Sequence, residues 1–205
     1  MLTCCNAHEH PWETFSVAAK WEPDDLRCLI IGESPGKDAE KYFYNEGRKV
    51  AVRTIMLRGL HRHGLLPEPT LVAFRKAGFL FDHAIRCILS PDIIQHEARL
   101  AERYESPRAA AATHLGPFLG RESPVWVMGR IARNAVAVLR PEFPRDTSDI
   151  SKPPNPRWLP DAPRFFASRY LLHASRAEVA QMFARLHPVM EENAGSQCLA
   201  CLSTS

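Results

Sequence analysis

Four short apolar runs, each followed by a turn, alternate along the chain with segments whose apolar residues recur at helical spacing. The runs predict buried strands at Leu26–Ile31, Phe79–Ile85, Pro124–Met128 and Arg164–Leu172. Helical spacing is found in Val50–Leu65, Ile94–Tyr104, Arg108–Leu119, Gly129–Leu139 and Ala177–Leu186. Strands separated by helices imply right-handed crossovers. The sequence therefore predicts an α/β fold, a three-layer α/β/α arrangement with a central, mostly parallel four-stranded sheet.

Changes in composition along the chain predict its organisation. Residues 1–25 precede the first strand and predict a leader segment, residues 26–190 predict one α/β domain, and residues 191–205 predict a flexible tail. The proline-rich segment 140–163 has little periodicity, so it predicts a long surface loop.

Composition narrows the class of protein. The chain has 205 residues, of which 45% are hydrophobic and 24% charged, as in ordinary globular domains. The formal charge of +3 permits local binding to a polyanion but does not argue for it. No apolar stretch suits a membrane span and no signal peptide is evident, so we expect a cytoplasmic protein without a membrane partner. The six cysteines are then expected to be reduced.

The first predicted strand ends in a tight acidic turn, Gly32-Glu33-Ser34-Pro35-Gly36. Ligands in open α/β sheets bind at the carboxyl ends of strands, and glycine lets a backbone approach a ligand closely. Glu33 is therefore a candidate for chemistry. An ordinary strand-to-helix turn with a solvated glutamate remains the alternative.

Two later strands end in comparable turns. The fourth runs into His173-Ala174-Ser175-Arg176, which puts an imidazole at a strand-to-helix junction, and the third ends in Gly129-Arg130 before an alanine-rich helix. In order and spacing the three motifs resemble the uracil-DNA glycosylase superfamily, with its GExPG-type loop, glycine-arginine turn and HPS-type loop. The resemblance spans roughly residues 26–186.

The resemblance implies a role for each site residue. Glu33 would orient the attacking water or stabilise the cationic sugar, and His173 would donate a hydrogen bond to the departing base. Phe43 would stack on the base; the neighbouring Tyr44 is one alternative for this role, and an ordinary core position is an equal alternative for Phe43. The substrate-binding set is Gly32, Ser34, Pro35, Phe43 and His83.

Two positions depart from the superfamily pattern. His83 stands where an asparagine commonly reads the uracil edge, so a different or broader range of damaged bases is possible. Ala174 replaces a proline that stiffens the last loop. Ser175 and Arg176 are the predicted DNA contacts, and Ser175 can also serve as the N-cap of the final helix.

The resemblance also raises a metal question. One branch of the superfamily holds an iron-sulfur cluster with four cysteines, and the corresponding stretches here offer Cys5, His8, Cys87 and His114. Two thiolates and two imidazoles suit structural zinc better than an iron-sulfur cluster, which we do not expect. Chance clustering of these residues is the alternative, and hydrolysis requires no cofactor.

Together these features predict a monomeric, monofunctional DNA glycosylase that hydrolyses the N-glycosidic bond of a flipped-out damaged base, with uracil favoured. No lysine stands at a matching position to form a Schiff base. Two alternatives stay open: a non-catalytic nucleic-acid-binding member of the same fold, and a hydrolase or transferase that acts on free nucleosides or nucleotides.

Overall fold

The computed structural model describes residues 11–35, 38–86, 114–121, 123–140, 157–159, 162–168 and 170–188. Four parallel strands form the sheet in the order β2-β1-β3-β5, namely β1 (Cys28–Gly32), β2 (Phe79–His83), β3 (Val125–Met128) and β5 (Ala162–Ser168). The predicted parallel sheet is thus confirmed, with the last strand ending earlier than expected because residues 171–173 form a 3₁₀ turn.

A fifth strand corrects the sequence analysis. β4 (Arg157–Leu159) pairs antiparallel with β5 at the edge of the sheet. It lies in the proline-rich segment that we expected to be a loop. Three residues are too few to show an alternating pattern, and an edge strand tolerates nearby prolines because only one of its sides needs a hydrogen-bonding partner.

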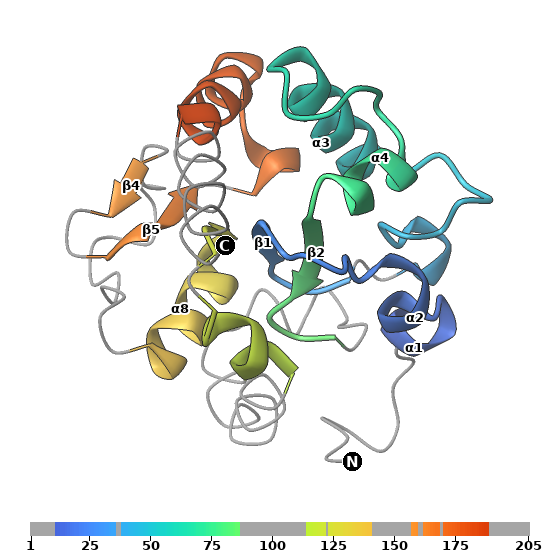
Figure 1. Ribbon diagram of the computed structural model, residues 1–205, viewed down its shortest axis with the longest axis horizontal. Coiled ribbons are helices and arrows are strands. Elements are labelled where there is room, and N and C mark those ends of the chain that lie inside the picture. The colour runs from blue at the N-terminus through green and yellow to red at the C-terminus, as the bar shows by residue number, and fades with distance from the viewer. Residues whose placement is uncertain are drawn as a thin grey trace, which may run out of the picture.

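Helices cover both faces of the sheet (Figure 1). The described ones are α1 (Pro11–Thr14), α2 (Val17–Trp21), η1 (Ala39–Lys41), α3 (Ala51–Arg62), α4 (Leu71–Lys76), helix 114–119, α8 (Arg130–Leu139), η2 (Leu171–His173) and a helix described over 176–188. In Figure 1, α3 and helix 176–188 lie above the strands, whereas α8 and helix 114–119 lie below them. None of these helices is long and apolar enough to cross a membrane.

The core has aromatic rings on both sides of the central strands. Trp126 of β3 is fully buried and makes T-shaped contacts with Phe166 and Phe183, at ring-centroid distances of 5.8 and 5.4 Å. A Cβ atom on Gly59 would lie 2.1 Å from the ring of Phe183, so only a glycine here lets α3 and helix 176–188 meet. Apolar burial of this kind supplies most of the driving force for folding.

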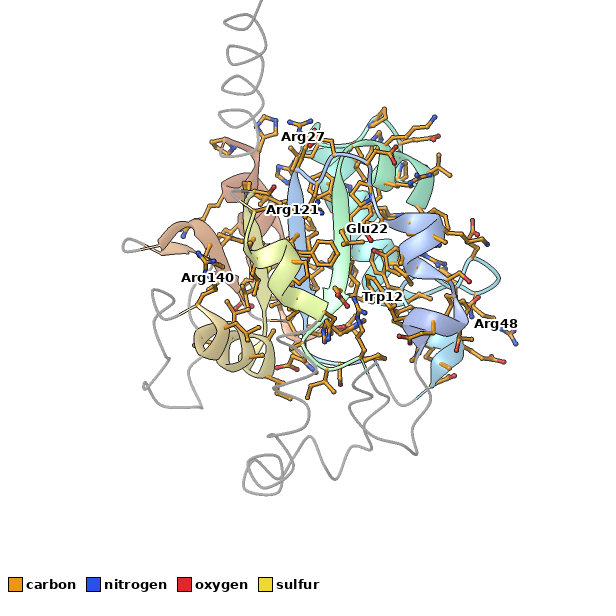
Figure 2. The ribbon with its side chains drawn as sticks, turned by 60° about the horizontal axis from the view of Figure 1, so that its bottom comes forward. Trp12, Glu22, Arg27, Arg48, Arg121 and Arg140 are labelled. Atoms are coloured by element: carbon orange, nitrogen blue, oxygen red, sulfur yellow. The ribbon has the colours of Figure 1, made fainter. Side chains whose placement is uncertain are left out.

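The N-terminal helices belong to this core. Trp12, Val17 and Trp21, which lie within the segment expected to be a leader, are buried in the same hydrophobic cluster as the sheet. The side chain of Trp12 projects from α1 toward Arg86, which follows β2 (Figure 2). Residues 11–25 therefore pack as part of the domain. The expected tail, 191–205, lies outside the described residues.

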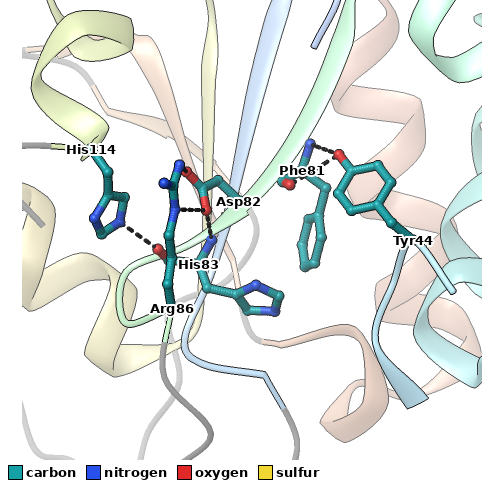
Figure 3. Close-up of polar contacts among 6 residues, drawn as sticks. All are labelled: Tyr44, Phe81, Asp82, His83, Arg86 and His114. Carbon is teal, nitrogen blue, oxygen red and sulfur yellow. Dashed lines mark hydrogen bonds and ion pairs between the residues drawn. The ribbon is translucent and has the colours of Figure 1, made fainter. Parts of the chain in front are cut away.

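A tyrosine provides hydrogen bonds to the outer strand of the sheet, on the side where that strand has no partner strand. β2 is the strand at one end of the sheet, so half of its backbone groups have no partner strand. The Tyr44 hydroxyl donates to the carbonyl oxygen of Phe81 at 3.0 Å and accepts from the N–H of Phe81 at 2.8 Å (Figure 3). One buried hydroxyl thus satisfies both outward-facing backbone groups of Phe81 and fixes the segment that contains Tyr44 against β2.

We predict that Tyr44→Phe lowers the free energy of unfolding by about 2–4 kcal/mol, because two buried backbone groups lose their partner. Urea unfolding measures it. The matched control is Tyr42→Phe, since no hydrogen bond to the Tyr42 hydroxyl is present among the described residues. Equal destabilisation by the two variants would contradict this role.

Candidate functional site

The parallel register brings the predicted site residues to the edge of the sheet formed by the carboxyl ends of its strands. Gly32 at the end of β1 lies opposite His83 at the end of β2. The pairing continues into the loops, where Ala84 N–H donates to the Gly32 carbonyl at 2.8 Å and Ile85 N–H donates to the Glu33 carbonyl at 3.0 Å. η2, which carries His173, follows β5 at the same edge. Glu33, His83 and His173 therefore all lie at carboxyl ends of parallel strands.

The Glu33 carboxylate lies at the N-terminus of α8. Its Oε1 accepts a hydrogen bond from Ile131 N–H at 3.2 Å. Gly129, with φ 86° and ψ 173°, precedes the helix, and a Cβ atom there would lie 2.5 Å from the same oxygen. Unpaired N–H groups and the helix dipole favour an anion at this position. The glycine-arginine turn thus provides the space for the carboxylate.

Tyr170 connects Glu33 with the His173 loop. Burial first and the charge of Glu33 second raise the pKa of Tyr170 to about 12, so its phenol stays neutral. The rings of Tyr170 and His173 lie 6.0 Å apart between centroids. His173 itself is exposed on η2, where a ligand at this edge could reach it.

His83 is a buried, neutral imidazole. It is only 3% exposed, and desolvation lowers its pKa to about 4, although the nearby Asp82 charge acts in the opposite direction. Its ring makes a T-shaped contact with Phe81 and lies 5.6 Å from the Tyr42 ring. Within the described part of the chain, Nδ1 is buried and has no hydrogen-bond partner. A buried polar atom without a partner is rare in native structures and calls for an explanation.

The backbone around His83 is held by a charged cluster (Figure 3). Arg86 bonds both carboxylate oxygens of the fully buried Asp82, at 3.1 and 2.7 Å, and Asp82 also accepts the N–H of His83 at 2.7 Å. Arg86 lies over the ring of Trp12, 3.6 Å from its centroid. Because Asp82 and Arg86 are paired and bonded, their burial is tolerated.

Of the three consecutive aromatic residues 42–44, Tyr42 is the one whose ring lies beside His83. Phe43, the expected stacking residue, is 1% exposed and packs in the core against Phe81, Tyr44 and Phe74, at centroid distances of 4.5, 4.9 and 5.5 Å. This is the core interpretation that the sequence left open. Tyr42 packs against Phe15 on its other side.

The remaining predicted contacts lie on two loops. Ser34 and Pro35 are buried beside Glu33, and Gly32 has no room for a side chain, since a Cβ atom would lie 3.0 Å from Phe81 Cζ. Ser175 forms a capping box: its Oγ accepts Glu178 N–H at 3.3 Å and its own N–H donates to Glu178 at 2.7 Å. Arg176 is exposed in the first turn of helix 176–188.

Of the four candidate zinc ligands, only His114 is described. Its Nε2 is hydrogen-bonded to the carbonyl oxygen of His83 at 3.0 Å, whereas Cys5, His8 and Cys87 lie outside the described residues. No group of three or more His, Cys, Asp or Glu side chains within the described ranges is arranged to hold a metal ion.

Sequence reasoning missed three contributors to the site: Tyr42, Gly129 as the neighbour of Glu33, and Tyr170. A glycine directly after a buried strand was the available signal for Gly129. Tyr42 and Tyr170 carried no distinguishing signal, because each stands next to other aromatic or apolar residues.

No protein-family model and no curated protein matches the chain.

We predict that Gly129→Ala displaces Glu33 and lowers the free energy of unfolding by about 1–3 kcal/mol. A side chain at this positive φ is strained and would overlap the carboxylate. Thermal unfolding measures it. Gly116→Ala is the control, since a Cβ atom there has no neighbour within 4 Å. Equal stability of the two variants would mean that the turn adapts freely.

We also predict that His83 makes the protein less stable in mild acid. The unfolded chain binds a proton near the ordinary pKa of 6.5, but the folded chain does so only near 4, so the free energy of unfolding falls as pH falls between these values. The full decrease in the free energy of unfolding is about 3 kcal/mol. Arg86 and His114 reinforce the lowered pKa and Asp82 opposes it.

Urea unfolding of wild type and His83→Asn across this pH range isolates the contribution of His83. The stability difference between the two proteins should change with pH, since asparagine does not titrate. A constant difference would show that His83 titrates normally in the folded protein.

Proposed function

We propose that this protein is a DNA base-excision glycosylase that hydrolyses the N-glycosidic bond of a flipped-out damaged base, with uracil as the favoured substrate. The observation that carries the proposal is the unpartnered Nδ1 of His83, buried beside Gly32 at the strand edge that also holds Glu33. A buried polar atom without a partner is unfavourable, and a base edge would supply the missing hydrogen bond.

The charges at this edge suit the two ends of a breaking glycosidic bond. The sugar becomes cationic as the base leaves, and the carboxylate of Glu33 would stabilise it and orient water. The base becomes anionic, and the exposed His173 would donate a hydrogen bond to its carbonyl oxygen. A neutral His83 would contact the base edge without adding a charge. Tyr42 lies beside His83 but is only 2% exposed, so it would support the His83 ring rather than stack on the base.

On the DNA side, Arg176 would contact a phosphate. The Ser175 hydroxyl already caps helix 176–188, so its DNA contact would be additional to that role. Ala174 leaves the loop without the stiffness of a proline.

We predict that Glu33→Gln and His173→Ala each lower the single-turnover rate on uracil-containing single-stranded DNA by about 10²–10³-fold, the usual effect of removing one group that stabilises transition-state charge. Gln keeps an acceptor for Ile131 N–H and removes only the charge. DNA affinity should change little, because phosphate contacts dominate it. Quantification of abasic-site formation gives the rate, and fluorescence anisotropy gives the affinity.

Glu68→Gln and His61→Ala are the controls, since both residues are exposed and neither lies in a loop that follows β1, β2 or β5. Unchanged rates in the Glu33 and His173 variants would refute the mechanism. DNA binding without base release from uracil, hypoxanthine, xanthine or thymine-mismatch substrates would instead indicate a non-catalytic member. Turnover of free nucleosides without salt-dependent DNA binding would indicate the third class of function.

A further inference from the structure

A groove of about 740 Å³ lies between α3 and helix 176–188, and residues of η2 also line it. The two helices are neighbours in Figure 1 and meet at the base of the groove, where Phe183 packs against Gly59 and lies 6.0 Å from the ring of His63. On one wall, the residues that line the groove run from Thr54 in α3 to His63, which directly follows this helix, over a length of about 14 Å. We call this the basic groove.

Its centre is apolar. Ile55 and Val179 are half-buried on opposite walls, and Leu172 is 48% exposed. Leu172 is one of only two large hydrophobic side chains that are exposed among the described residues. An apolar strip between two helices has the shape to receive the apolar face of a third helix.

Its rim is cationic and unpaired. Arg58 and Arg62 lie one turn apart on α3, and Arg176 lies on the other wall. In the described part of the chain none of these three side chains has an ion pair or hydrogen bond, and no acidic residue lines the groove. Three unneutralised guanidinium groups around an apolar strip favour a ligand with carboxylates on its flanks.

We propose that the basic groove binds an acidic amphipathic helix of a partner protein. The partner would place apolar side chains on Ile55, Leu172 and Val179 and carboxylates on the arginines, the arrangement of helix-in-groove recognition. The apolar strip favours a peptide over nucleic acid, because a phosphate backbone needs the cations alone and Phe183 is too buried to stack on a base. This site does not rest on the proposed glycosylase function.

The probe is a fluorescein-labelled synthetic helix, about three turns long, with leucines along one face and glutamates on both flanks. Anisotropy should show saturable binding to the full chain. Arg58→Glu/Arg62→Glu should weaken binding at least about ten-fold, with Arg58→Gln/Arg62→Gln as the milder pair, and Leu172→Asp should also weaken it. These changes leave Arg176, our candidate DNA contact, intact.

Lys20→Glu/Lys76→Glu is the matched control, because it makes the same change in charge at exposed positions outside the groove. It should bind like wild type. The proposal is overturned by absence of saturable binding, by equal weakening in the control, by equal binding of a peptide with serines in place of leucines, or by binding of an undamaged oligonucleotide that Arg58→Glu/Arg62→Glu weakens as much as binding of the peptide. The last outcome would assign the groove to nucleic acid.

Discussion

The register that sets Gly32 opposite His83 determines where the side chains of the site lie. A Cβ atom on Gly32 would lie 3.0 Å from Phe81 Cζ and 3.3 Å from His83 Cδ2, so a side chain here would crowd the His83 ring. β1 is also paired with β3 on its other side, and all three strands are parallel. A slip of one residue would turn these side chains to the other face and separate them.

The two polar side chains at the end of β2 differ in their hydrogen bonding. Asp82 is fully buried, yet its carboxylate receives hydrogen bonds from Arg86 and from the N–H of His83. His83 is nearly as buried, but its Nδ1 has no partner among the described residues, at a cost of about 1–3 kcal/mol. Packing alone does not explain why a histidine rather than an apolar residue stands here. The proposed contact with a base edge would explain it.

The core strands could be predicted from sequence because they are buried on both faces and therefore appear as continuous apolar runs. β4 could not, because a short edge strand has no such run. The roles of Tyr42, Phe43 and Tyr44 stayed open in the sequence for a physical reason: three consecutive aromatics have no polar pattern to orient them. The Tyr44 hydroxyl decides their orientation by bonding the backbone of Phe81, which leaves Phe43 toward Phe74 and Tyr42 beside His83.

Glu33 differs from His83 in that backbone atoms fix its position. The N–H of Ile131 holds one carboxylate oxygen, and the missing side chain of Gly129 provides the space around it. Backbone groups at a helix start do not change rotamer, so a carboxylate held there needs little reorganisation when charge develops nearby. In the proposed reaction, Glu33 would therefore act mainly as a fixed charge and acceptor. Specificity would be determined separately, by hydrogen bonding between the His83 ring and the base edge.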